Sequence, residues 1–387
     1  MRKTEKKVFR RKTSNRRTKK QRKNNRKKTV MKGGFDIVPV IKDYLNKKIQ
    51  KTECENKSCN LITSSKSDQI INICSDSVYK QPPSGYNDFK DIEIEWSNKG
   101  RGYRIIKVNP HTMNLFIQSV FNDHNVADVE KYNKICFKDG KPAMEGNKYE
   151  FDTGINSLTD YITKTTPDPD AEIIKIQMVK ICNKLDELYN NFQFHHCDPK
   201  TDQIFLNGSN FILGDLDKVT FSVKYTDDNK KEHYYRVRLS TLDATKRSIG
   251  SKFRSVGLRG GRSISEMMRF EDRPRAHCDF EKCAFIASLM LSANEALYKQ
   301  LTKRDNDGNP VLIDDLLNCT NSDNAVVDMG KVQEMRNNTK DKKLLKGHSV
   351  ATQCVKLINT EYANEIKSDF DLSTPKPKPT NIFNLFQ

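Results

Sequence analysis

Residues 196–206 read His-Cys-Asp-Pro-Lys-Thr-Asp-Gln-Ile-Phe-Leu, and this stretch decides the expected fold more than any other part of the chain. Lys200 and Gln203 follow the acid Asp198, and the apolar run 204–206 comes next. A turn at Asn207 and Gly208 then leads into a second apolar run, which ends just before Asp215. The pattern predicts two short strands around a tight turn, with an acidic residue just beyond each.

Further elements are predicted from hydrophobic periodicity on both sides of this stretch. Residues 92–96 alternate apolar and acidic side chains, residues 103–108 are predicted as a second strand, and the two are expected to form a hairpin around the turn at 98–102. The clearest helix covers residues 171–191, where Ile174, Met178 and Ile181 recur at helical spacing. We also expect helices at 112–133, 155–162, 283–297 and 347–366, a short strand at 148–151, an exposed hairpin at 219–239 and a mobile loop at 240–275.

Residues 196–206 resemble the catalytic loop of protein kinases, in which His-Arg-Asp is followed by a lysine, an asparagine and a strand. Leu213-Gly214-Asp215-Leu216-Asp217 stands where kinases carry the metal-binding Asp-Phe-Gly. Residues 105–108, Ile-Ile-Lys-Val, resemble the strand that carries the kinase lysine. Residues 148–151 with 156–158 resemble the hinge and the helix after it. The resemblance covers roughly residues 90–300 and implies a divergent Ser/Thr protein kinase-like protein.

The resemblance assigns roles to four residues around the catalytic loop. Asp198 would accept the proton of the substrate hydroxyl, and Lys200 would neutralise charge on the γ-phosphate of ATP. Asp215 would hold Mg²⁺, and the amide oxygen of Gln203 would serve a second Mg²⁺. His196 would hold the loop backbone in a structural role.

Four more residues are assigned to nucleotide binding in the same way. Lys107 would pair with the α- and β-phosphates, and Glu130 would be its ion-pair partner. Asp123 and Asp128 are acidic alternatives to Glu130. Glu150 and Phe151, in the hinge-like segment, would contact the nucleotide.

The sequence also departs from the kinase pattern. Gln203 replaces the usual asparagine, and Leu216-Asp217 replaces Phe-Gly. No glycine-rich loop precedes Lys107, and no clear Ala-Pro-Glu follows. Two alternatives to an active kinase therefore stay open: a pseudokinase that binds or scaffolds, and a nucleic-acid-associated or virion structural protein.

The resemblance implies an α+β, bilobal protein-kinase-like fold, with a small β-rich N-lobe and a larger helical C-lobe. Asp279 or Glu281 would match the architectural acid that begins the buried central helix of the C-lobe. The expected organisation is a disordered basic tail (1–34), an N-terminal extension of unclear structure (35–84), an N-lobe (85–155), a C-lobe (156–300) with a long activation segment (218–278), and a C-terminal helical extension and tail (301–387).

The charge of the chain is concentrated in its N-terminal tail. The net charge is +18, but residues 1–33 contain 17 Lys and Arg and one acid, so the rest of the chain is at +2. Such a block stays solvated and attracts polyanions, so we expect a nucleic acid or an import receptor as its partner, beside a protein substrate for the kinase-like domain. A polybasic tail that ends in Gly-Gly also resembles tails on proteins of large DNA viruses.

The expected compartment is intracellular (nucleus, cytoplasm or a virion), because no apolar secretion signal and no run long enough for a membrane span is present. The ten cysteines are then expected as reduced thiols. Zinc is a weaker interpretation of the pairs Cys54/Cys59 and Cys278/Cys283, because no second pair stands at the usual spacing.

Overall fold

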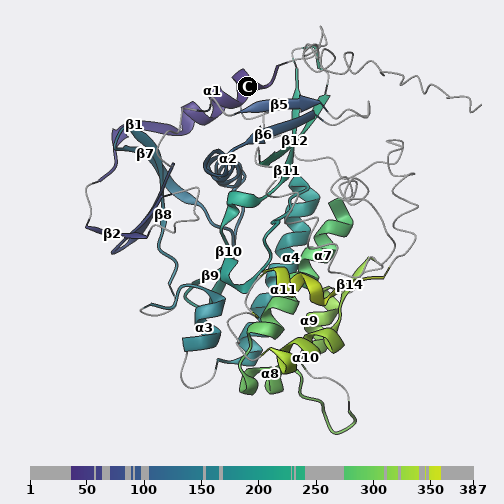
Figure 1. The fold of residues 1–387 in the computed structure, drawn as a ribbon. Coiled ribbons are helices and arrows are strands. Elements are labelled where there is room, and N and C mark those ends of the chain that lie inside the picture. The colour runs from purple at the N-terminus through teal and green to yellow at the C-terminus, as the bar shows by residue number, and fades with distance from the viewer. Residues whose placement is uncertain are drawn as a thin grey trace, which may run out of the picture. The chain divides into compact units, whose positions relative to one another are not determined.

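The structure is a computed structural model with two larger β-sheets and a group of helices, and it confirms the expected α+β class (Figure 1). It describes residues 36–55, 58–62, 70–82, 89, 92–96, 104–150, 154–164, 169–227, 229–230, 232–239, 274–308, 312–320, 324–339, 345 and 348–358. The predicted basic tail, residues 240–273 of the loop predicted at 240–275 and the end of the chain lie outside these residues, whereas residues 274–275 of that loop begin a helix. No helix of the described part is long and apolar enough to cross a membrane.

The first sheet has six strands in the order β1-β7-β8-β4-β3-β2. Its strands are β1 (Ile49–Glu53), β2 (Cys59–Ile62), β3 (Ile70–Cys74), β4 (Ser77–Gln81), β7 (Tyr132–Lys138) and β8 (Lys141–Asn147). All pairs are antiparallel except β1 with β7. The sheet therefore crosses the domain boundary predicted at 84/85, because β4 pairs with β8. Residues 35–84, which we could not interpret from sequence, supply four of its strands and the helix α1 (Val38–Lys48).

Helix α2 (Pro110–Asp123) lies between the two larger sheets (Figure 1). It begins where Asn109 accepts a hydrogen bond from the Thr112 N–H and Pro110 takes the first helical position, a favoured start. The helix contacts both sheets, because Ser119 hydrogen-bonds the Tyr132 hydroxyl on β7 and Phe116 packs edge-on against Phe221. The predicted helix at 112–133 was too long, since residues 132–138 belong to strand β7.

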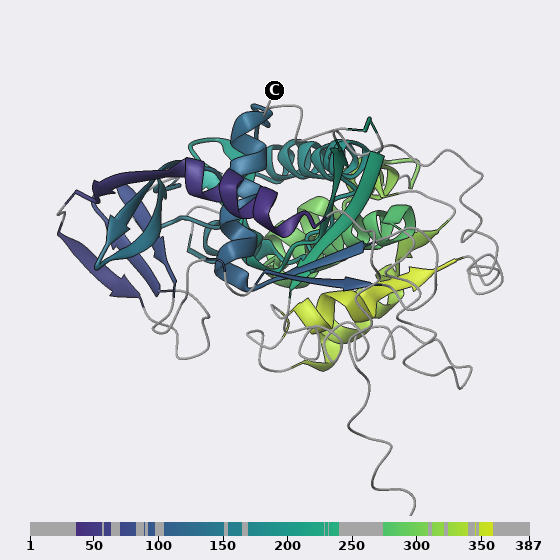
Figure 2. The same ribbon diagram turned by 90° about the horizontal axis from the view of Figure 1, so that it is seen from above.

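The second sheet has four strands in the order β11-β12-β6-β5, formed by β5 (Glu93–Trp96), β6 (Arg104–Val108), β11 (Phe221–Thr226) and β12 (Glu232–Leu239). Both predicted hairpins are confirmed, but they pair with each other through the parallel strands β6 and β12 (Figure 2). The prediction that the hairpin at 219–239 is exposed was wrong: Phe221, Val223, Tyr235 and Val237 are fully buried.

The remaining described chain is mainly helical. Its helices are α3 (Leu158–Lys164), α4 (Ala171–Phe192), α7 (Pro274–Ser292), α8 (Glu295–Leu301), α9 (Ile313–Cys319), α10 (Met329–Asn338) and α11 (His348–Ala351). Two small hairpins accompany them, β9 (Ile204–Asn207) with β10 (Asn210–Leu213), and β13 (Ala325–Val327) with β14 (Val355–Leu357). The α4 and β9–β10 predictions are confirmed. The strand predicted at 148–151 is not present at 148–150, because β8 ends at Asn147, and 355–357 form a strand where a helix was expected.

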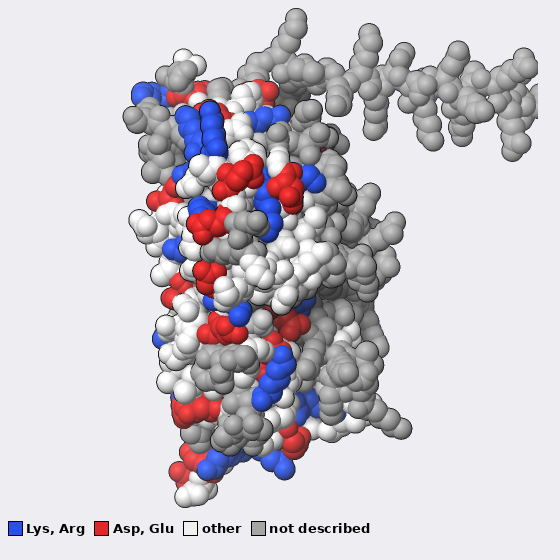
Figure 3. Space-filling view, turned by 90° about the vertical axis from the view of Figure 1, so that its left-hand side faces the viewer, with Lys and Arg blue, Asp and Glu red and all other residues white. Residues whose placement is uncertain are grey.

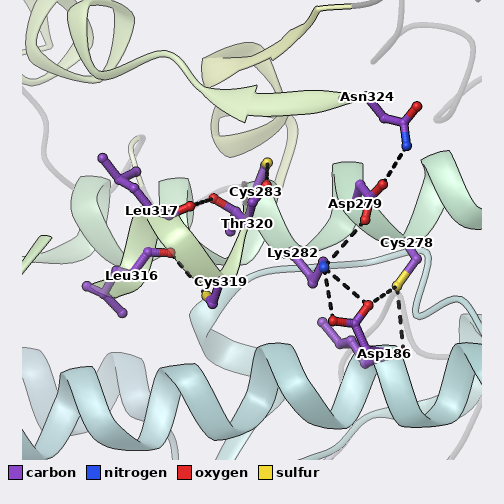
Figure 4. A network of polar contacts seen from close by, with 11 residues as sticks. Asp186, Cys278, Asp279, Lys282, Cys283, Leu316, Leu317, Cys319, Thr320 and Asn324 are labelled. Carbon is purple, nitrogen blue, oxygen red and sulfur yellow. Dashed lines mark hydrogen bonds and ion pairs between the residues drawn. The ribbon is translucent and has the colours of Figure 1, made fainter. Parts of the chain in front are cut away.

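Helix α7 is held against α4 by a buried polar network (Figure 4). The Lys282 amine lies 3.1 Å from both carboxylate oxygens of Asp186 on α4 and 3.4 Å from Asp279. Asp279 also accepts a hydrogen bond from Asn324, which precedes β13. Burial alone would lower the pKa of Lys282, but Asp186 and then Asp279 raise it, so the amine stays charged. The network therefore fixes how α7 is oriented toward α4.

Charged residues of both signs are mixed on the described surface seen in Figure 3. This agrees with a net charge of only +2 outside residues 1–33.

Four of the ten cysteines form disulfides, so the expectation of reduced thiols throughout was wrong. Cys54 after β1 is bonded to Cys136 on β7, and Cys59 on β2 is bonded to Cys74 on β3. The zinc interpretation of Cys54 and Cys59 is excluded for the same reason, since each sulfur bonds another cysteine. Both bonds connect paired strands of the six-stranded sheet.

A thiol titration checks the disulfides. We expect six reactive thiols in the unfolded, unreduced protein and ten after reduction. Reduction should lower the free energy of unfolding by about 2–5 kcal/mol, because the unfolded chain regains the freedom that the cross-links removed. A Cys354→Ser variant, which loses a free thiol, is the control. Ten thiols before reduction would contradict the assignment.

Candidate functional site

The loop that carries Asp198 is anchored by a buried glutamate on helix α7. Glu281, which is 1% exposed, accepts hydrogen bonds from the backbone N–H groups of His196 (2.9 Å) and Cys197 (2.5 Å). Cys197 has a φ of 63°, a left-handed conformation that is uncommon for a residue with a Cβ. The two hydrogen bonds therefore hold a strained backbone next to Asp198. Of the two architectural candidates, Glu281 takes this position, while Asp279 belongs to the Lys282 network.

His196 connects this loop to the one that carries Asp215. Its Nε2 lies 2.8 Å from the carbonyl oxygen of Gly214, and its ring is fully buried. Burial lowers the pKa of His196, so the ring is neutral and Nε2–H donates to the carbonyl. Gly214 is needed here, because a Cβ would come within 2.1 Å of the Phe205 ring. This is the structural role that the sequence predicted for His196.

Asp198 is buried and its Oδ2 faces three side chains. The Lys218 amine lies 2.8 Å away, the Gln203 side-chain N–H donates at 3.4 Å, and the Lys200 amine lies 3.6 Å away. Burial alone would lower the pKa of Lys218, but Asp198 and Asp217 raise it above its ordinary value, so Lys218 is a cation. The predicted set Asp198, Lys200 and Gln203 is thus brought together, with Lys218 added.

Asp215 follows β10 in a left-handed conformation, with φ 55° and ψ 62°. Its backbone N–H donates to Glu130 Oε2 over 2.8 Å. No described residue donates a hydrogen bond to its carboxylate. The backbone of Asp215 is therefore fixed by Glu130.

The other oxygen of Glu130 pairs with a lysine. The Lys80 amine on β4 lies 2.5 Å from Glu130 Oε1, and the two side chains are only 12% and 9% exposed. Burial alone would lower the pKa of Lys80, but Glu130, followed by Asp215 and Asp217, raises it. Lys80 is thus a buried cation that interacts with Glu130 and with two acids of the loop after β10, Asp215 and Asp217.

Asp217 is a further acid at this place. Burial and then Asp215 raise its pKa to about 7, while Lys218 and Lys80 act in the opposite direction. Its Oδ1 is shielded from solvent and has no hydrogen-bond partner.

Two predicted residues, Lys107 and Glu150, are not brought into this cluster. Lys107 lies on β6 of the four-stranded sheet, where it is paired in register with Glu93 and Arg238, and Lys80 takes the position beside Glu130 that we had predicted for it. Glu150 binds Lys148 and the Gly154 N–H. Phe151 lies outside the described residues.

Sequence reasoning missed three residues: Lys80, Lys218 and Asp217. Lys80 stands in Ser-Val-Tyr-Lys-Gln, and the alternating burial of this strand is evident only in the structure. Lys218 and Asp217 lie next to Asp215 and were visible only as departures from the kinase pattern.

No protein-family model matches the chain, and no curated protein is significantly similar to it. The described residues contain no group of three or more His, Cys, Asp or Glu that could hold a metal ion by itself.

The role of Glu281 can be tested by replacing its carboxylate with the amide of glutamine. Glu281→Gln should lower the free energy of unfolding by about 2–3 kcal/mol, because one of the two buried N–H groups then faces an NH₂ group. Chemical denaturation measures the difference. Glu172→Gln, on the exposed first turn of α4, should change it by less than about 0.5 kcal/mol. Equal losses in both variants would contradict the anchoring role.

Proposed function

We propose that the chain is an ATP- and Mg²⁺-dependent protein kinase that transfers the γ-phosphate to Ser or Thr hydroxyls of proteins. One observation supports this most strongly: the buried pair of Lys80 and Glu130, whose second oxygen binds the backbone of Asp215. In protein kinases a strand lysine pairs with a glutamate, and this pair and the metal-binding aspartate must both be in place for phosphoryl transfer.

The proposal includes a bilobal kinase-like arrangement. The six-stranded sheet with α2 would form the small lobe, and α3, α4 and α7 would belong to the helical lobe. The chain order supports this: a strand with the lysine, a helix, two strands, helices, the loop with Asp198, and the two strands that lead to Asp215. The hairpin β5–β6 and its pairing with β12 would be additions to that plan.

The donor set at Asp215 fits a Mg²⁺–ATP complex. Its carboxylate accepts no hydrogen bond from a described residue, and Mg²⁺ in kinase sites is held by one or two carboxylates plus the phosphates of the substrate. Bound Mg²⁺ would neutralise charge on the phosphates. Lys80 would bind the α- and β-phosphates from β4, the role that sequence alone assigned to Lys107.

Asp198 would orient the substrate hydroxyl and accept its proton. Two cations near its carboxylate, Lys218 and Lys200, would bind the γ-phosphate once ATP is present. Lys200 favours a protein substrate, because the resemblance to protein kinases includes this lysine. A nucleic acid or an import receptor bound by residues 1–33 remains part of the proposal, although those residues lie outside the described structure.

A pseudokinase is the second candidate, and the surroundings of Asp198 favour it. Its Oδ2 is occupied by Lys218, by Lys200 and by the amide of Gln203, so the oxygen that would orient a substrate hydroxyl is already engaged. In that case ATP would bind without turnover.

Two lysine variants separate the two assignments. Lys80→Met should lower phosphate transfer from ATP by about 10²-fold or more, because a cation aimed at the phosphates is lost. Lys107→Met, the matched control on β6, should keep near-wild-type activity. Asp198→Asn should lower activity by about 10²- to 10⁴-fold while ATP still binds. Transfer of labelled phosphate and a thermal shift with ATP measure these effects.

The outcomes discriminate the hypotheses. ATP binding without transfer in the wild type would favour the pseudokinase. Loss of activity in Lys107→Met but not in Lys80→Met would restore the assignment made from sequence. No ATP binding by the folded protein would contradict both candidates.

A further inference from the structure

We propose that Asp217 is the second carboxylate that holds the metal–nucleotide complex, in place of Gln203. This inference rests on the proposed function, because it concerns the metal of the same site. It assigns a binding role to a residue that stands where kinases carry the glycine of Asp-Phe-Gly.

The first observation is an unsatisfied atom. Asp217 Oδ1 is buried and has no hydrogen-bond partner. An unpaired buried acceptor is unfavourable, more so when it is charged, so native proteins seldom keep one without a ligand, water or ion. This oxygen is therefore available to a donor or a cation.

The second observation is the position of Asp217 in the fold. Asp217 lies in the short 3₁₀ helix Leu216–Lys218, which starts from the strained backbone of Asp215. Leu216 between the two acids is fully buried, which fixes this turn in the core. Asp217 interacts electrostatically with Asp215, Lys80 and Lys218. It thus shares the surroundings of the first metal ligand and of the cations proposed to hold the phosphates.

The third observation concerns Gln203, the residue assigned to this role from sequence. Its side-chain N–H donates to Asp198, its backbone N–H donates to Lys200, and its carbonyl accepts from Gly214. Gln203 therefore links the two loops. A carboxylate is also the better ligand for Mg²⁺, a hard cation. One or two carboxylates plus substrate phosphate oxygens are the usual way in which Mg²⁺ is held in kinase sites.

Binding of Mn²⁺ to the full-length protein, followed by electron paramagnetic resonance, tests the role without relying on activity. The protein is first saturated with an ATP analogue that cannot be hydrolysed. Asp217→Asn should weaken Mn²⁺ binding by about 10- to 100-fold, the range seen when support for a metal is removed. Affinity for the nucleotide without metal should stay unchanged. Gln203→Leu should bind Mn²⁺ nearly as tightly as the wild type.

Asp202→Asn is the matched control, since Asp202 lies next to Gln203 but has no described ion pair. Wild-type Mn²⁺ affinity in Asp217→Asn would overturn the inference and leave the kinase proposal standing. Failure of the wild type to bind the metal–nucleotide complex would instead contradict the proposed function itself. If Asp217→Asn does not fold, Asp217→Ser takes its place with the same readouts.

Discussion

The ion pair between Lys80 and Glu130 is the interaction on which the candidate site depends. Glu130 uses one oxygen for the Lys80 amine and the other for the Asp215 N–H, so it connects the six-stranded sheet to the loop after β10. Both side chains are nearly buried, and removal of one partner would leave an uncompensated charge, at a cost of about 3–5 kcal/mol. A buried ion pair is weak evidence that the protein is stabilised. It does fix how Lys80, Glu130 and Asp215 lie relative to one another, because it joins three segments that are distant in sequence.

A second buried glutamate, Glu281, fixes the backbone beside Asp198, the other candidate acid. Glu281 holds the backbone before Asp198, and His196 then joins this loop to Gly214. Two of the eight described non-glycine residues with positive φ lie at the site: Cys197 precedes the candidate acid Asp198, and Asp215 is itself a candidate acid. Uncommon backbone conformations persist where surrounding contacts enforce them, and here the enforcing contacts come from Glu281 and Glu130. The charges of the cluster are thus arranged before any ligand binds.

The local part of this arrangement could be predicted from the sequence. Helix α4 and the strands β9 and β10 follow from short-range periodicity, and the grouping of Asp198 with Lys200 and Gln203 was implied by the resemblance to the kinase catalytic loop. Glu130 was named as the partner of a lysine, but the wrong lysine was chosen. Lys80 and Lys107 both stand on alternating strands, and only strand pairing over long sequence distances tells which sheet each strand joins. The disulfides could not be predicted for the same reason: Cys54 and Cys136 are 82 residues apart, and their spacing does not reveal that β1 and β7 are neighbours.

The most direct test of this account identifies the lysine that faces bound nucleotide. An adenosine analogue with a sulfonyl fluoride in place of the terminal phosphates modifies a lysine beside the phosphate site, and mass spectrometry of the digested protein locates it. The account predicts modification of Lys80, prevented by excess ATP. ATP-protected modification of Lys107 with Lys80 left unmodified would contradict it.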